Sequence, residues 1–497
     1  MSSTTTYDRQ LGVRLLTPGQ MLSAPDDSTV DMWVPATRTE APPRQLSPLD
    51  RQMLDVETDT TPLHVGALVL LDSAAAERPL DVVSLRRLFA RRLHRIPALC
   101  RRLRTVPLGL DQPYWETCGT VDLSYHIRDV RLPDGADDRQ VADYVARQHE
   151  APLDRSRPMW ECRLLSGLSG GRQAVYMKVH HAVIDGVSGA EIMGAVLDAD
   201  ATGTPTLPPA GAVPQDRAPG LATMLARSLT NVVERPGAGI RSLLSAVPAL
   251  LRSVDDLRQR HPDVPFNEPN TAARSFAFVS LPLDQVKAVK NTVGGTVNDV
   301  VMTLCATAVR QWMLDRGIAA DRPLLAAIPV SVRTPEEFGT AGNRFSVMLS
   351  TLPTDEADPR HRLKLMHENM VTAKAHFRSL PPDILHQAGA LLTPLLHGLP
   401  TRGLLRAAAS SLPLVNLLVS NVPGPQIPLY LNGIRALGSY PVSVLTPLSG
   451  GMNITVMSYD GHLDFGIIAC PDTVPDIDRI AAGLKQGLAE LSRTSAG

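Results

Sequence analysis

A segment rich in proline, glycine and threonine, residues 201–215, divides this sequence into two long parts. Helices and strands tolerate few such residues, so we predict that the segment is a linker. The chain has 497 residues, which is too many for one compact hydrophobic core and suits two domains of ordinary size. We therefore expect two folded parts, one on each side of the linker.

The apolar pattern predicts strands and helices before the linker. Apolar runs bounded by turn residues are typical of strands, and apolar residues three or four apart are typical of helices. The expected elements are a strand at 64–72, a helix at 82–94, strands at 160–165 and 174–179, and a helix at 187–198. Leu49 and Asp50 come earlier and either line an entrance or open a first strand, which is the interpretation we favour.

The pattern after the linker is again mixed. The expected helices are 221–233, 240–259, 283–292 and 297–315, and the expected strands are 275–281, 324–328, 345–352, 452–459 and 462–470. Asp460-Gly461, between the last two strands, is the strongest hairpin signal in the chain. Since strands and helices recur without strict alternation, we predict an α/β fold with mixed sheets in two layers.

These elements set the predicted domain boundaries. Residues 1–44 are rich in Ser, Thr, Asp and Pro and are predicted to be a flexible N-terminal extension. An N-terminal subdomain is expected at 45–200, a linker with amphipathic helices at 201–270, and a C-terminal subdomain at 271–497.

Composition excludes several classes of protein. Hydrophobic residues make up 44% and charged residues 20%, as expected of a packed globular chain. The net charge of -1 gives no overall field for nucleic acid, and five scattered cysteines suggest neither a disulfide framework nor a zinc knuckle. We find no secretory signal and no apolar run of spanning length, so a cytoplasmic protein is expected.

Arginines cover one side of the helix predicted at 82–94 and continue through Arg104. The general rule favours a solvated helix face. The alternative is a landing site for the phosphates of a cofactor or for an anionic membrane surface.

Two adjacent histidines are the main candidates for chemistry. His180 and His181 end a predicted strand and are followed by Asp185 and Gly186. Neighbouring strand residues point to opposite faces, so one histidine can face a cavity while the other points into the domain. An imidazole can accept a hydroxyl proton at neutral pH. Spacing alone leaves a structural or metal-binding role equally open, although the H-E-x-x-H and G-x-S-x-G motifs are absent.

The stretch His180-His181-Ala-Val-Ile-Asp185-Gly186 matches the HHxxxDG motif of the chloramphenicol-acetyltransferase-like superfamily. Within it, the chain resembles the bacterial wax ester synthase/diacylglycerol acyltransferase family, in particular actinobacterial triacylglycerol synthases. The other segments that carry the resemblance are 46–50 with 61–66, 152–161, 297–301, 342–344 and 420–425. The likeness runs from about residue 46 to about residue 490.

The resemblance implies roles for individual residues. His181 would be the general base that deprotonates an acceptor hydroxyl as it attacks an acyl-CoA thioester. Asn298 is a candidate oxyanion donor, although a plain helix cap is an equal alternative. His180, Asp185 and Gly186 would support the loop, and a buried Asp185 would need a partner, for which Arg157 is one weak candidate.

The resemblance also implies the fold and the substrates. Two similar subdomains would enclose an active-site tunnel, with acyl-CoA as co-substrate and no bound cofactor or metal. We favour diacylglycerol as the acceptor over a fatty alcohol, which would give a wax ester. Alternatives are transfer to a polyketide or complex-lipid alcohol, and a non-catalytic lipid-binding protein. Peripheral contact with the inner membrane or lipid droplets is expected, and nucleic-acid binding is not.

Overall fold

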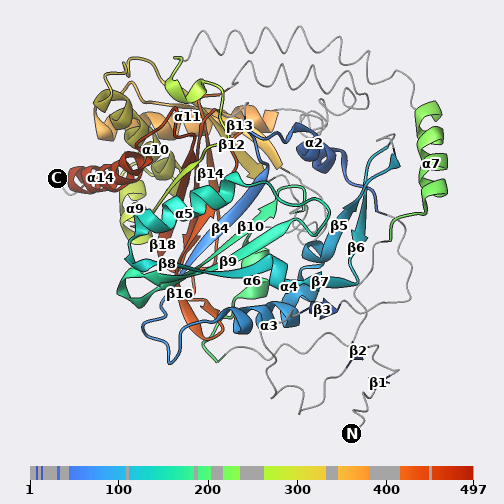
Figure 1. The fold of residues 1–497 in the computed structure, drawn as a ribbon. Coiled ribbons are helices and arrows are strands. Elements are labelled where there is room, and N and C mark those ends of the chain that lie inside the picture. The colour runs from blue at the N-terminus through green and yellow to red at the C-terminus, as the bar shows by residue number, and fades with distance from the viewer. Residues whose placement is uncertain are drawn as a thin grey trace.

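Two six-stranded β-sheets form the centre of the fold in the computed structural model of the chain (Figure 1). The structure describes residues 7–8, 13–14, 31–33, 44–107, 111–183, 189–202, 217–234, 262–331, 345–379, 415–446 and 450–495. The predicted helix at 240–259, most of the predicted linker and most of the N-terminal extension lie outside these residues.

The first sheet has the strand order β15-β16-β4-β10-β9-β8. Its strands are β4 (His64–Leu71), β8 (Ile127–Ala136), β9 (Trp160–Leu168), β10 (Gln173–His180), β15 (Tyr430–Leu431) and β16 (Ile434–Val442). The associated helices are α2 (Pro48–Val56), α3 (Val82–Arg92), α4 (Leu123–His126), α5 (Asp138–Glu150) and α6 (Gly189–Val196). β10 lies in the middle, antiparallel to both β4 and β9, so its last residue ends inside the sheet.

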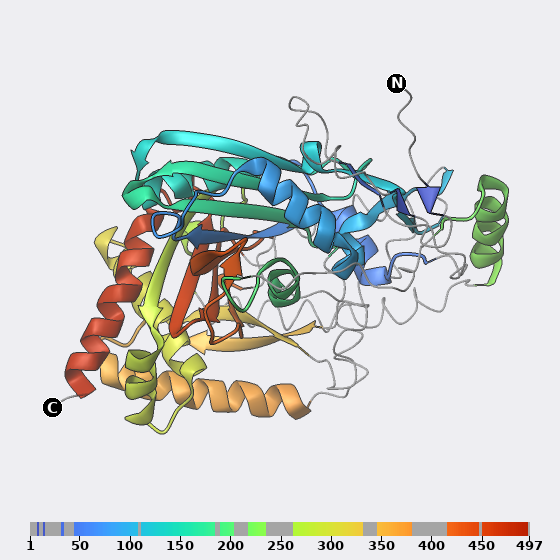
Figure 2. The same ribbon diagram turned by 90° about the horizontal axis from the view of Figure 1, so that it is seen from below.

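The second sheet has the order β11-β18-β17-β14-β12-β13. Its strands are β11 (Ser275–Pro282), β12 (Leu324–Ser331), β13 (Phe345–Leu352), β14 (Leu417–Val422), β17 (Met452–Tyr459) and β18 (His462–Ala469). Its helices are α9 (Leu283–Asn291), α10 (Val297–Asp315), α11 (Pro359–Ser379) and α14 (Ile477–Ser495). Figure 2 shows α11 and α14 on the outside of this sheet, where both contact α10.

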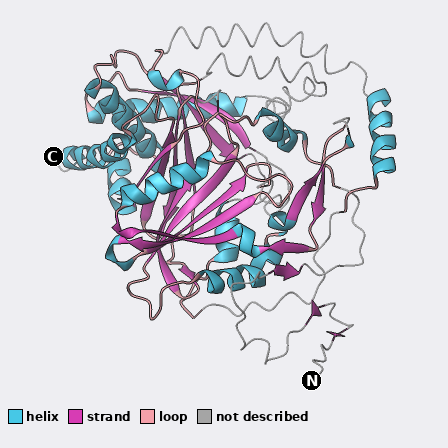
Figure 3. Ribbon diagram, in the orientation of Figure 1, coloured by secondary structure: helices cyan, strands magenta, loops and turns pink. Residues whose placement is uncertain are grey.

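Smaller elements lie at the periphery. β5 (Arg101–Arg104) pairs with β6 (Tyr114–Thr117), β3 (Asp31–Trp33) with β7 (Thr120–Asp122), and β1 (Tyr7–Asp8) with β2 (Val13–Arg14). α7 (Leu221–Glu234) lies apart from both sheets (Figure 3).

Most of the predicted strands and helices in the described residues are present. The β17–β18 hairpin closes through Asp460 and Gly461 at φ 41° and 77°, the positive values that a two-residue hairpin turn requires. One prediction was wrong: Leu49 and Asp50 belong to helix α2 rather than to a strand. The Ser47 side chain accepts the Asp50 N–H at 3.1 Å, and Pro48 opens the first turn, where its missing N–H has no cost.

The two halves are joined by a strand that crosses between them. β16 follows the linker by more than two hundred residues, yet it pairs with β4 of the first sheet. It also approaches β18 closely, since a Cβ atom built on Gly466 would lie 1.7 Å from the Pro441 carbonyl oxygen. Buried side chains from both halves form one cluster there, among them Leu68, Tyr176, Phe276, Tyr440 and Ile468. The predicted domain boundaries stay a prediction. Residues 430–442, from the C-terminal part of the chain, belong to the first sheet.

Candidate active site

His180 is the last residue of β10, and its side chain is buried at 1% exposure. Its Nδ1 atom accepts the Ala182 N–H at 3.1 Å, so the ring proton of the neutral form lies on Nε2. Nε2 faces the Glu57 carboxylate at 3.5 Å, the distance of an ion pair rather than of a tight hydrogen bond. His180 is thus held by one hydrogen bond at Nδ1 and faces a carboxylate at Nε2, which suits a supporting role.

His181 lies in the turn that follows β10 and has different surroundings. Its backbone N–H donates to the Leu63 carbonyl at 2.8 Å. The residue as a whole is partly exposed, while its Nδ1 atom is shielded from solvent. Burial, and then the charge of neighbouring His180, lower the pKa of His181 to about 4. The imidazole is therefore neutral at pH 7, which is the form that can accept a proton.

Glu57 holds this arrangement together, although no sequence motif marks it. It caps the end of α2, with a side chain that is 10% exposed. One carboxylate oxygen accepts the Leu63 N–H at 3.1 Å, and the other faces His180 and receives a short bond from Arg155. Leu63 therefore links the Glu57 side chain to the His181 backbone through its N–H and its carbonyl. Burial raises the pKa of Glu57, but the bonds from His180, Arg155 and Leu63 outweigh it and lower the value to about 2.

Asn298 lies in the first turn of α10, which begins with a capping box. The Thr296 hydroxyl accepts the Asp299 N–H, and the Asp299 carboxylate accepts the Thr296 N–H at 2.8 Å. His367 of α11 adds a 2.8 Å contact to the same carboxylate. The alternative interpretation of Asn298 as a plain helix cap is therefore wrong, because Thr296 supplies the cap.

The Asn298 amide is oriented by a second asparagine. Asn421, in β14, donates its side-chain N–H to the Asn298 side-chain oxygen at 3.1 Å. An amide whose oxygen is occupied in this way keeps its two N–H donors for another acceptor. This is the polarity that an oxyanion donor needs. None of the contacts between described residues joins Asn298 to either histidine.

Other predicted residues fall outside this arrangement. Asp185 and Gly186 of the motif lie outside the described residues, as does the segment 342–344. Arg157 contacts Asp122 and Asp154 at 3.4 and 3.6 Å and stacks over the Tyr125 ring.

Met159 and Trp160, in the segment 152–161 that carries the resemblance, are fully buried core residues. Trp160 stacks on Phe89 and His126, and its indole N–H donates to the Leu99 carbonyl at 2.8 Å.

The arginine-rich face of α3 is partly structural. Arg92 is buried at 4% exposure and forms a two-oxygen ion pair with Asp198 at 2.7 Å. Arg86 donates to the Ile127 carbonyl at 2.9 Å. Arg87, Arg91 and Arg95 are exposed, as the solvated-face interpretation predicted.

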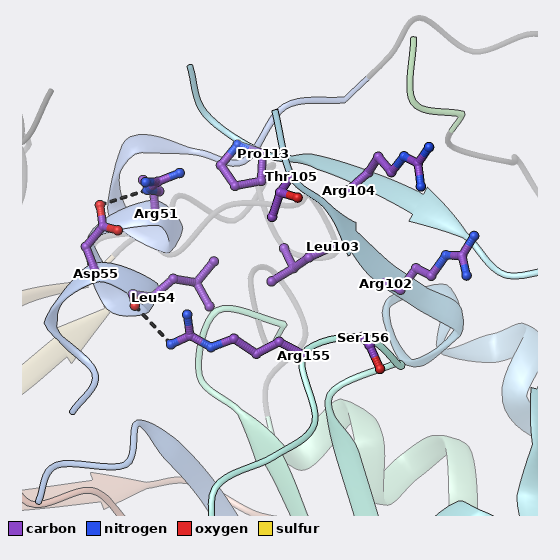
Figure 4. Close-up of a pocket in the computed structure, with 10 residues that line it drawn as sticks. All are labelled: Arg51, Leu54, Asp55, Arg102, Leu103, Arg104, Thr105, Pro113, Arg155 and Ser156. Atoms are coloured by element: carbon purple, nitrogen blue, oxygen red, sulfur yellow. Dashed lines mark hydrogen bonds and ion pairs between the residues drawn. The ribbon is translucent and has the colours of Figure 1, made fainter. Parts of the chain in front are cut away.

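A separate pocket of about 580 Å³ lies next to Glu57 (Figure 4). It is bounded by α2, by the β5–β6 hairpin and by the loop that carries Arg155, and its lining includes Arg51, Arg102, Arg104 and Arg155. Arg155 also bonds to Glu57, so the pocket is two contacts away from His180.

Comparison with known proteins decides the family. The model of the wax ester synthase/diacylglycerol acyltransferase catalytic domain matches residues 46–301, and that of the WS/DGAT C-terminal domain matches residues 341–492. The chain belongs to this family. This wax ester synthase/diacylglycerol acyltransferase family member is therefore an O-acyltransferase, as the HHxxxDG resemblance predicted.

Relatives match the family member over most of its length. A protein of Mycobacterium tuberculosis (strain H37Rv), named as a diacylglycerol O-acyltransferase, is 35% identical over 469 residues, covering 90% of this chain and 99% of the relative. The O-acyltransferase WSD of Acinetobacter baylyi is 29% identical, covering 89% and 96%.

Solved structures confirm the predicted fold class. The wax ester synthase/diacylglycerol acyltransferase from Marinobacter aquaeolei VT8 matches with a TM-score of 0.67 and 30% identity, covering 91% of this chain and all of that one. A condensation domain of the calcium-dependent antibiotic synthetase matches at 0.53 and 18% identity, which shows the shared fold of two mixed α/β subdomains. Within the described residues, no helix is long and apolar enough to cross a bilayer.

Proposed function

We propose that this acyltransferase transfers a long-chain acyl group from acyl-CoA to diacylglycerol, with His181 as the general base. The observation that carries the proposal is the state of the two histidines. His180 is buried and held by Glu57, whereas His181 is partly exposed and neutral at pH 7. A neutral imidazole on a rigid support is what deprotonation of an alcohol requires.

The reaction needs no covalent acyl-enzyme. His181 takes the proton from the acceptor hydroxyl as that oxygen attacks the thioester carbonyl carbon. The tetrahedral intermediate then breaks its C–S bond, and the imidazolium returns the proton to the CoA thiolate. The low pKa of His181 makes this return favourable, since an imidazolium of pKa about 4 is a strong acid.

The negative charge that develops on the carbonyl oxygen needs a fixed donor. We assign this role to the Asn298 amide, whose orientation Asn421 supports. For the loop residues His180, Asp185 and Gly186 we propose positioning roles. The Glu57 contacts support this role for His180. A tunnel between the subdomains, reached by both substrates, completes the proposal.

The acceptor is best tested by product identity. Labelled palmitoyl-CoA is supplied with diacylglycerol or with hexadecanol, and the products are separated by chromatography. We expect labelled triacylglycerol in larger amount than wax ester, in agreement with the names of the mycobacterial relatives. Wax ester as the main product would shift the assignment toward wax ester synthesis, one of the two activities in the name of the Marinobacter enzyme. Label in neither product would refute both acceptors.

We also propose peripheral contact with a membrane or lipid droplet. α7 exposes Leu221 and Leu225 at 56% and 36%, and exposed leucines on a helix suit a lipid surface. Flotation of the protein with triolein-filled phospholipid droplets is expected. Its loss in the Leu221→Ser/Leu225→Ser double variant would support α7 as the contact, whereas no flotation of the native chain would refute the proposal.

A further inference from the structure

The pocket beside Glu57 has the chemistry of a phosphate site. Figure 4 shows Leu54 and Leu103 facing each other across the space, with the guanidinium groups of Arg51 and Arg155 beside α2. Arg102 and Arg104 lie on one face of β5 at the rim of the pocket, and their side chains extend away from the side on which Leu103 points. Guanidinium groups pair with phosphate through two N–H donors at once, which makes arginine the preferred residue for such ligands.

Hydrogen bonds hold the guanidinium groups of Arg51 and Arg155 in place and use only some of their N–H donors. The Arg51 Nε donates to the Asp55 carboxylate at 2.7 Å. The Arg155 Nε and Nη2 donate to Glu57, and Nη2 also donates to the Leu54 carbonyl at 3.0 Å. Among the described residues, the two Nη atoms of Arg51 and the Nη1 of Arg155 have no partner. Carboxylates thus fix the direction of both groups and leave their outer N–H donors for a ligand.

The charge around the pocket is positive. Four arginines line it, and Asp55 is the one carboxylate among the lining residues. Glu57 and Glu116 stand behind Arg155 and Arg102 as their ion-pair partners. Arg104 is exposed and has no carboxylate partner in the described part of the chain. The pocket therefore keeps a net attraction for an anion.

The walls are not purely polar. Leu54, Leu103 and Pro113 line the pocket together with the Thr105 and Ser156 hydroxyls. The pocket thus combines apolar walls with polar groups in a volume of about 580 Å³. A nucleotide, with a flat base and phosphates, fits this combination better than a free inorganic ion does.

We propose that this pocket binds the phosphate-bearing nucleotide end of the CoA acyl donor. The inference rests on the proposed function, in which the CoA donor brings such a group to the enzyme. The pantetheine arm separates the phosphates from the thioester, so their site is expected at the surface, away from the base. Glu57 contacts both Arg155 of the pocket and His180, so one carboxylate connects the pocket with the histidines.

The test measures binding of CoA to the purified full chain by calorimetry, without an acyl group or an acceptor. Arg51→Gln and Arg104→Gln are each expected to weaken CoA binding about tenfold, the effect of losing one charge-assisted hydrogen bond. CoA binding by these two variants should also depend less on salt concentration than CoA binding by the native chain does. Arg139→Gln on α5, at an arginine that is 73% exposed and distant from the pocket lining, is the matched control. Thermal unfolding confirms that each variant is folded.

Further arms separate the alternatives. 3′-Dephospho-CoA, which lacks one phosphate, should bind more weakly and be less affected by the variants. Vesicles of phosphatidylglycerol should bind the native chain and Arg51→Gln equally well. If Arg51→Gln loses vesicle binding but keeps CoA binding, the pocket is reassigned to lipid headgroups. Arg87→Gln tests the exposed face of α3, and a larger effect there than at Arg51 would overturn the proposal.

The outcomes also distinguish this inference from the proposed function. If Arg51→Gln and Arg104→Gln bind CoA as well as the native chain does, the pocket is not the CoA site, and CoA can still be the acyl donor. Native chain that does not bind CoA at all would refute the donor itself, and the pocket assignment would fall with it.

Discussion

Glu57→Gln is the substitution that tests the support of the histidines most specifically. It keeps the size of the side chain and its capacity to accept the Leu63 N–H, but it removes the charge that faces His180 and Arg155. The folded chain lowers the pKa of Glu57 from 4.5 to about 2. Each tenfold change in the acid dissociation constant corresponds to about 1.4 kcal/mol, so the charged carboxylate contributes about 3 kcal/mol to stability at pH 7.

The sign of the pH dependence follows from the lowered pKa. A carboxyl whose pKa is depressed on folding contributes fully above its unfolded value of 4.5 and loses that contribution as the pH falls toward 2. Native chain and Glu57→Gln should therefore differ by about 3 kcal/mol at pH 7 and by about 1 kcal/mol at pH 3.

The assay is urea unfolding, followed by tryptophan fluorescence, of native chain and variant at both pH values. Glu77→Gln, at an exposed glutamate, is the matched control and should change the free energy of unfolding by less than about 0.5 kcal/mol. A difference between native chain and Glu57→Gln that is equally large at pH 3 and pH 7 would rule out this explanation, because it could not come from the charge.

Three other predictions concern the base, the oxyanion donor and the junction between the sheets. The plot of kcat/KM against pH should stay flat from pH 8 to about 5 and fall to half near pH 4, since His181 must be unprotonated; a midpoint near 6.5 would contradict the lowered pKa of the base. Asn421→Ala should lower kcat about fivefold with KM unchanged, because the Asn298 amide loses a hydrogen bond of about 1 kcal/mol; a change in KM alone would argue against this role. Gly466→Ala should destabilise the chain by about 3 kcal/mol in thermal or urea unfolding, because its Cβ would meet the Pro441 carbonyl, whereas Gly194→Ala, with open space around it, should not.

Local elements of the fold could be predicted because each leaves its signal in consecutive residues. The Asp460-Gly461 turn and the capped start of α10 are examples. Helix α2 also had its signals, since Ser47 and Pro48 are typical of a helix start, and the strand interpretation gave them too little weight. The position of β16 left no such signal, because its partner β4 is defined only by the folded chain.

The candidate site was predictable only where a family motif covers it. His181 and Asn298 lie in motifs that the sequence displays, but their supports come from distant segments. Glu57 and Arg155 are 98 residues apart, and Asn298 and Asn421 are 123 residues apart. Nothing in a single sequence marks such pairs, because the contact depends on how the elements pack.

The proposed function depends above all on His181 acting as the base in acyl transfer. The decisive measurement is the rate of CoA thiol release from palmitoyl-CoA with diacylglycerol, comparing native chain, His181→Ala and the control His376→Ala, at an exposed histidine of α11. We predict that His181→Ala loses activity by a factor of about 10² to 10⁴, as expected for a general base, while His376→Ala stays at the native rate. A folded His181→Ala variant that releases CoA at the native rate would show that His181 is not the base.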